Sequence, residues 1–138
     1  MKRYTFPNND IFIVALIIFI FFLLIEVTLR IYDLYFYFPE VDIPSHFFAG
    51  MAILSGVYWV LSLVRIKKIK VFSVFYTLLV AIFWEILETL QELIIENPPH
   101  LVDIFFWDGF FDIIITVIGG AFTLIFFYIL RRTTPLRI

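Results

Sequence analysis

Three segments of the sequence carry carboxylate or imidazole side chains at the spacing of one helical turn. The pairs are Asp42 with His46, Glu85 with Glu88, and Asp108 with Asp112. Residues three or four positions apart share one face of an α-helix, so each pair would project from one side of its helix. Carboxylate pairs on facing helices, together with histidine, are how di-metal sites are built in helical bundles. A set that is rich in oxygen and has one imidazole favours Mg²⁺, Mn²⁺, Ca²⁺ or non-haem iron, and suits Zn²⁺ less well.

This pattern leads to a hypothesis about the role of each residue. The divalent-metal ligands are expected to be His46, Glu85, Glu88 and Asp112. Asp42 is expected to accept a hydrogen bond from His46 and so orient the ring, and Asp108 is the candidate general base. Such a site can activate water or clamp a phosphate group. We therefore expect hydrolytic or transfer chemistry on a lipid or lipid-linked envelope substrate.

Simpler interpretations exist for the residues nearest the helix ends. Asp42 and Asp108 each precede a predicted helix, and a role as helix N-cap explains each of them about as well as a role in a metal site. His46 taken alone is typical of a packed, hydrogen-bonded histidine. The matching acids on neighbouring helices are what favour the metal interpretation.

The acids further from the ends of the predicted helices differ in how well a purely structural role explains them. Glu26 and Arg30 are four residues apart with the acid first, which predicts an ion pair within one helix. Glu85 and Glu88 lie too deep in their apolar segment to be caps. Only Arg30 is available at that end to pair with them, so they are the strongest indication of a site.

The composition places these residues in a membrane protein. Of 138 residues, 63% are hydrophobic and 16% charged, and the mean hydropathy is +1.04. Soluble domains are only about 45–50% apolar and about 25% charged, so a soluble globular fold is excluded. There is no cysteine, which excludes disulfides and thiolate ligands, and the net charge of -2 argues against a nucleic-acid partner.

Four apolar windows are long enough to cross a bilayer as helices, which takes about 20 residues each. They span residues 11–29, 44–64, 71–95 and 109–130. Asn9 and Asp10 are candidate caps of the first window, Asp42 or Ser45 of the second, and Asn97-Pro98-Pro99 ends the third. The windows predict an all-α fold and a multi-pass protein of the cell membrane. Because the connections are short, the four helices are expected to form an up-down bundle in the lipid bilayer, as a single domain over 1–138.

The basic residues predict the orientation of the bundle. Nine of the ten lie on one side of the four windows, and Arg30 alone lies on the other. Because lysine and arginine are retained on the cytoplasmic side, both termini are predicted to be cytoplasmic. The three polar pairs would then lie at a similar depth near the outer face.

Three parts of the sequence together resemble a known family. They are Asp42-Ile43-Pro44-Ser45-His46 with Gly50, Trp84-Glu85 with Glu88, and Trp107-Asp108 with Asp112 and Gly119. This order resembles the VanZ-like superfamily and its related uncharacterised small prokaryotic integral membrane proteins, over about residues 41–121. The resemblance implies a polytopic helical protein whose polar positions form one shared site, and it implies no established reaction. Pro44 and Thr116 depart from the pattern, since Lys and Asn are frequent near these positions in that superfamily.

Two other classes of function remain open from the sequence. The same acids would serve a transporter that passes protons or cations, but transport needs a polar route to the other face. The inner halves of the predicted helices offer mainly the hydroxyls of Ser55, Ser62, Ser73, Thr77 and Thr123. The second class is a non-catalytic subunit of a membrane complex, in which a basic residue of a partner balances the charge of these acids. The sequence leaves a homo-oligomer open as well.

Overall fold

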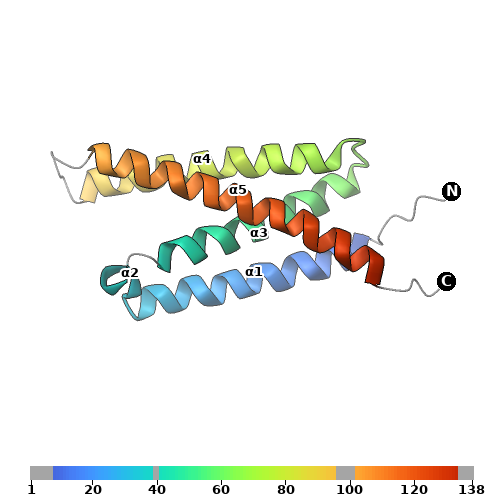
Figure 1. Cartoon of the computed structure of the whole chain (residues 1–138), viewed down its shortest axis with the longest axis horizontal. Helices are drawn as coiled ribbons and strands as arrows, with labels where there is room; N and C mark the ends of the chain where they lie inside the picture. Colours follow the sequence, from blue (N-terminus) through green and yellow to red (C-terminus); the bar gives the residue numbers. More distant parts are fainter. Residues whose placement is uncertain (1–7, 39–40, 96–101, 134–138) are drawn as a thin grey trace.

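The fold is an all-helical bundle, shown by a computed structural model that describes residues 8–38, 41–95 and 102–133. Its helices are α1 (Asn8–Ile31), α2 (Leu34–Tyr37), α3 (Asp42–Leu63), α4 (Ile69–Ile95) and α5 (Val102–Thr133) (Figure 1). Four of them, all except α2, are long and apolar enough to cross a membrane. The predicted fold class, four spanning helices that run alternately up and down, is confirmed.

Several helix boundaries differ from those predicted. α5 begins at Val102 rather than at Gly109, so Asp108 lies inside the helix and cannot be its N-cap. α3 begins at Asp42 itself, and the capping position is taken by Val41 without a side-chain hydrogen bond. The N-cap interpretation was therefore wrong for both aspartates, and for Ser45 too, which lies in the first turn of α3. The predicted stop at Asn97–Pro99 lies outside the described residues.

The connection between α1 and α3 contains the short helix α2, which the sequence did not predict. Asp33 precedes α2 in the left-handed conformation, with φ 53° and ψ 35°. Aspartate tolerates this conformation better than most residues, because its short polar side chain can hydrogen-bond locally. The chain therefore reverses direction directly after α1, which brings α3 back alongside it (Figure 1).

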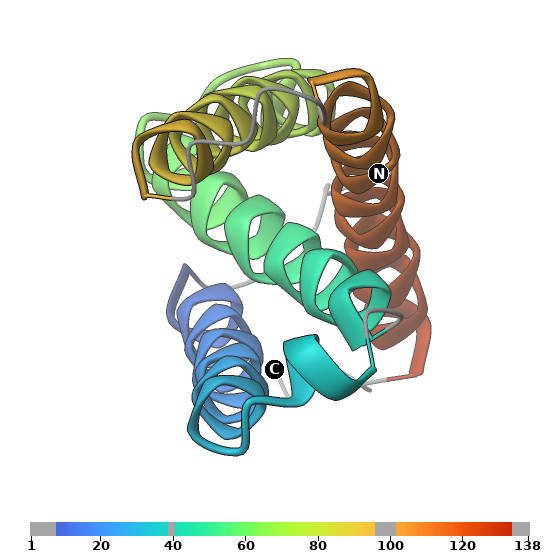
Figure 2. The ribbon, with the colours of Figure 1, turned by 90° about the vertical axis from the view of Figure 1, so that its left-hand side faces the viewer.

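Helix α3 lies at the centre of the molecule. It packs against α1 on one side and against α4 and α5 on the other, as the end-on view shows (Figure 2). It is also the least apolar of the four spanning helices and the most enclosed, with 44% of its spanning window buried against 11% for α1. The helix that carries His46 is thus the one surrounded by the others.

The two helices α3 and α5 cross at unusually close range, because glycines meet at the crossing. A Cβ atom placed on Gly50 would lie 1.8 Å from the carbonyl oxygen of Thr116, and one on Gly119 would lie 2.0 Å from that of Phe47. Small residues at such crossings are how membrane helices bring their backbones together. The crossing fixes the register of α3 against α5 one turn beyond His46.

Hydroxyl side chains fill much of the middle of the bundle. Four of them are at most 1% exposed, and each donates to a backbone carbonyl of its own helix at 2.8–3.3 Å. They are Ser55, Ser73, Thr77 and Thr123. The large apolar side chains, in contrast, are mostly on the outside, where lipid would cover them. The described interior therefore mixes small and apolar side chains with hydroxyl groups that are satisfied locally.

Candidate metal centre

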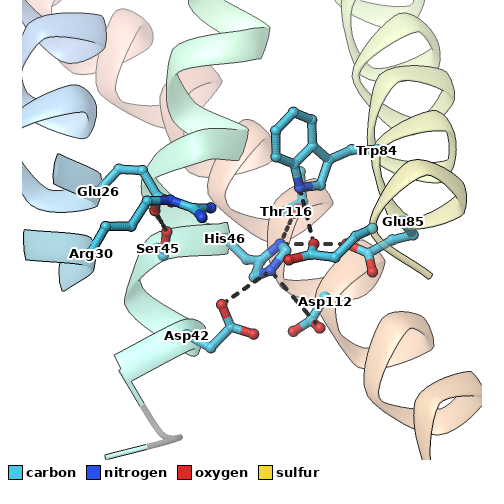
Figure 3. A network of polar contacts seen from close by, with 10 residues as sticks. Glu26, Arg30, Asp42, Ser45, His46, Trp84, Glu85, Asp112 and Thr116 are labelled. Atoms are coloured by element: carbon cyan, nitrogen blue, oxygen red, sulfur yellow. Dashed lines mark hydrogen bonds and ion pairs between the residues drawn. The ribbon is translucent and has the colours of Figure 1, made fainter. Parts of the chain in front are cut away.

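His46 is the centre of a cluster formed by three spanning helices. The residue lies in the second turn of α3 and is 8% exposed. Its Nε2 lies 3.3 Å from Oδ1 of Asp42 on the same helix, and its Nδ1 lies 3.6 Å from Oε1 of Glu85 on α4. Oδ2 of Asp112, on α5, lies 3.9 Å from Nε2 (Figure 3). The polar faces predicted on three helices therefore point inward and meet at one imidazole.

The donor atoms fall into two groups that share His46. One consists of Asp42, His46 and Asp112, and the other of His46, Glu85 and Glu88. Within each group, one donor atom from every residue lies within 4.8 Å of the others, which is close enough for a single cation. Because Asp42 and Asp112 approach Nε2 and Glu85 approaches Nδ1, the two groups lie on opposite edges of the ring.

Asp108 is placed differently from the other predicted site residues. It lies one turn before Asp112 on α5, but it is exposed and belongs to neither of the two groups. Asp42 is partly exposed, at 34% of its side chain, and makes the close contact with His46 that an orienting acceptor requires. Asp108 is thus an exposed residue outside the cluster, while Asp42 is part of it.

Two further side chains complete the cluster through contacts that the sequence did not predict. Thr116 Oγ1 lies 3.4 Å from Nδ1 of His46, and Trp84 Nε1 donates to Oε2 of Glu88 at 3.1 Å. Both were detectable in principle, since Thr116 follows Asp112 by four residues and Trp84 precedes Glu88 by four. Each therefore shares a helix face with an acid of the cluster.

A glycine makes room for one of the carboxylates. A Cβ atom placed on Gly109 of α5 would lie 3.0 Å from Oε2 of Glu85 on α4. Any larger residue at this position would press on the Glu85 carboxylate, and Gly109 is therefore part of what lets it face His46.

The ion pair predicted between Glu26 and Arg30 is confirmed, and it extends to α3. Arg30 Nε donates to Oε1 of Glu26 at 2.5 Å, and the hydroxyl of Ser45 donates to Oε2 at 2.7 Å. Ser45 is 5% exposed and directly precedes His46 (Figure 3). Both oxygens of Glu26 are thus engaged, and α1 is tied to α3 beside the cluster.

The charges of the cluster do not balance internally. Four carboxylates, those of Asp42, Glu85, Glu88 and Asp112, lie around one imidazole. Even a protonated His46 would supply only one positive charge. Uncompensated charges are costly at membrane depth, so protons or a cation must neutralise the excess. The arrangement suits a divalent cation, whose oxygen and imidazole ligands are the donors present.

Comparison with known families agrees with the fold. Residues 1–133 match the family described as "Predicted membrane protein (DUF2238)", and the chain belongs to this family. Neither a curated protein nor a solved structure matches the chain. The family match includes α1, which the resemblance to VanZ-like proteins did not cover. The narrower VanZ-like relationship remains a prediction.

Proposed function

We propose that this protein binds a divalent cation at the His46 cluster and uses it for hydrolysis or group transfer on a lipid or lipid-linked substrate. The observation that carries the proposal is the convergence of one imidazole and four carboxylates from three spanning helices. Placing an ionisable side chain at the centre of a spanning helix costs about 2.5–3.5 kcal/mol on insertion scales, and less toward the helix ends. A bound cation such as Mg²⁺, Mn²⁺, Fe²⁺, Ca²⁺ or Zn²⁺ explains why four carboxylates and an imidazole lie together here.

The two edges of the imidazole ring suggest how the roles are divided. A histidine that binds a metal through one nitrogen usually donates its other N–H to a carboxylate. With the ion on the Nδ1 side, His46, Glu85 and Glu88 would be its ligands, and Nε2–H would donate to Asp42 at 3.3 Å. Asp112 would then stabilise the same N–H electrostatically from 3.9 Å, and would not be the fourth ligand expected from the sequence. This assignment retains the orienting role of Asp42.

The position of the cluster favours a substrate at the membrane surface. His46 lies in the second turn of α3, at the end of the bundle where Asp108 is exposed. A divalent cation there would polarise a phosphate or activate water. Asp108, one turn from Asp112, is placed to take a proton from the solvent side, and a headgroup at the bilayer surface is the substrate within its reach. By the predicted orientation, this is the outer leaflet.

Elemental analysis of purified protein tests the cation site. We expect near-stoichiometric metal in the native chain after dialysis without chelator. Glu85→Gln and Glu88→Gln keep the side-chain size and remove the charge, and each is expected to lower the metal content at least tenfold. Asp108→Asn is the matched control, since this exposed residue lies outside both groups. Metal-free native protein, or equal loss in the control, would refute the site.

The same analysis separates the two edges of the ring. If the ion lies on the Nδ1 side, Asp112→Asn should retain more metal than Glu85→Gln. The reverse order would place the ion between Asp42 and Asp112. Activity is then assayed on a lipid phosphate in mixed micelles, where loss of a general base is expected to lower kcat by ~10²–10⁴-fold in Asp108→Asn without loss of metal.

The packing of the bundle does not favour transport. A proton or cation route would have to continue from His46 through the middle of the described helices. There the hydroxyls of Ser55, Ser73 and Thr77 donate to backbone carbonyls of their own helices, and Thr123 does the same. Because these hydroxyls donate within their own helices, they do not form a continuous hydrogen-bonded chain along which a proton could pass. Ion flux in proteoliposomes that Glu85→Gln abolishes would reverse this preference.

A further inference from the structure

A second polar feature lies at the opposite end of the bundle from His46. It is a crevice between the last turns of α3, the first turn of α4 and the last turns of α5, lined by Tyr58, Lys70, Leu124, Phe127 and Tyr128. We propose that this crevice binds the phosphate group of an anionic phospholipid, with an acyl chain along Leu124 and Phe127. The proposal is independent of the cation site.

The basic residues at this end attract anions. Lys70 belongs to a group of exposed basic residues in the α3–α4 connection and the start of α4, together with Arg65, Lys67 and Lys68. None of these four forms an ion pair with a described residue. Anionic lipids attract such clusters at the membrane surface. The cluster supplies the attraction, and the crevice supplies a defined place for one headgroup.

Tyr58 gives the crevice a specific hydrogen-bond donor. Its side chain is 6% exposed, and its ring packs on Phe127 with centroids 5.3 Å apart. Within the described residues its hydroxyl has no hydrogen-bond partner, yet it is not sealed away from solvent. A buried tyrosine ring normally finds a partner for its O–H. Tyr58 lines the same crevice as Lys70, and a phosphate oxygen there would accept from both the phenol and the ammonium.

The depths of these groups match a lipid at the bilayer surface. Lys70 is the second residue of α4, at the level of the helix ends. Tyr58 lies five residues before the end of α3, which is about 7.5 Å deeper at 1.5 Å per residue. A headgroup phosphate would therefore contact the ammonium of Lys70 at the membrane interface and the phenol of Tyr58 on the side nearer the bilayer centre. The apolar side chains of α5 continue toward the hydrocarbon.

Lipid retention by the full chain tests the proposal. The detergent-purified protein is incubated with phosphatidylglycerol or phosphatidylcholine, and bound lipid is counted by native mass spectrometry. Lys70→Gln and Tyr58→Phe alter the crevice, and Lys67→Gln makes the same charge change in the neighbouring connection. We expect one phosphatidylglycerol per chain, weakened at least about tenfold in Lys70→Gln, which loses a hydrogen bond between charged groups, and by at most about fivefold in Lys67→Gln, the factor for losing one cation at an anionic surface. Tyr58→Phe should weaken binding without loss of fold.

Several outcomes would overturn the proposal. Equal weakening in Lys67→Gln and Lys70→Gln would mean diffuse attraction to the basic cluster rather than a site. Equal retention of phosphatidylcholine would remove the need for an anionic headgroup. Competition by millimolar inorganic phosphate, with no stable lipid adduct, would show that the crevice binds a free anion.

Discussion

Replacing Gly50 with alanine should separate α3 from α5 and disturb the cluster without touching any of its polar groups. The added methyl carbon would lie 1.8 Å from the carbonyl oxygen of Thr116 and 2.7 Å from its carbonyl carbon. Real Cβ contacts essentially never fall below 3.0 Å, so the gap must widen from 1.8 Å to at least 3.0 Å, by about 1.2 Å. Both obstructing atoms belong to backbone, and therefore no side chain can swing away.

The cost of this change follows from overpacking. Forcing extra carbon into a close-packed interior costs about 1–3 kcal/mol. Gly56→Ala is the matched control, because a Cβ there meets nothing within 4 Å. In a helix interior this control should gain up to about 1 kcal/mol from the higher helix propensity of alanine. The two identical substitutions, six residues apart on α3, are thus expected to have opposite signs.

Unfolding of the detergent-solubilised protein, followed by tryptophan fluorescence against temperature, measures the difference. Gly50→Ala should unfold at a lower temperature than the native chain and Gly56→Ala at the same or a higher one. Metal content should fall only in Gly50→Ala, since a wider gap would carry Asp112, already 3.9 Å from Nε2 of His46, further away and leave the metal-binding ring less firmly oriented. Equal unfolding temperatures for the two variants would refute the reasoning that this crossing holds the cluster together.

The remaining predictions concern contacts around the cluster. Ser45→Ala removes the hydroxyl that donates to Oε2 of Glu26 at 2.7 Å, and loss of such a bond to a charged group should cost about 1.5–3 kcal/mol in chemical denaturation. An unchanged midpoint would mean that α1 is held by apolar packing alone. Trp84→Phe removes the N–H that donates to Glu88 at 3.1 Å. Losing a hydrogen bond to a metal ligand weakens metal affinity by about 10–100-fold, and we expect about tenfold here, measured by titration calorimetry. Unaltered affinity would place Glu88 outside the ligand set.

The sequence was most informative about the helices and least about their ends. Apolar windows reveal spanning helices because the bilayer imposes their length. The start of α5 was misplaced because Asp108 has the residue type of a cap, whereas the helix continues through it from Val102. An aspartate in an exposed turn of a helix costs little, and a local cap signal cannot reveal such a continuation.

The candidate site was partly predictable for a similar reason. Helical spacing places Glu85 with Glu88 and Asp112 with Thr116, but it does not fix which way a shared face points. The inward direction is determined by the close crossing of α3 and α5 at Gly50, a tertiary contact. The same crossing explains why Asp112 is 7% exposed while Asp108, one turn earlier, is exposed.

The central position of α3 has a consequence for how the protein enters the membrane. α3 is the least apolar of the four spanning helices, and it is made before α4 and α5, the helices that cover its polar face. During synthesis, α1 is therefore the neighbour that can keep it in the bilayer, through its packing on α3 and the bond from Ser45 to Glu26. We expect a chain truncated after α3 to integrate poorly, and integration to be restored once α5 has emerged from the ribosome. Membrane insertion of this protein is then a cooperative event that is completed by α5.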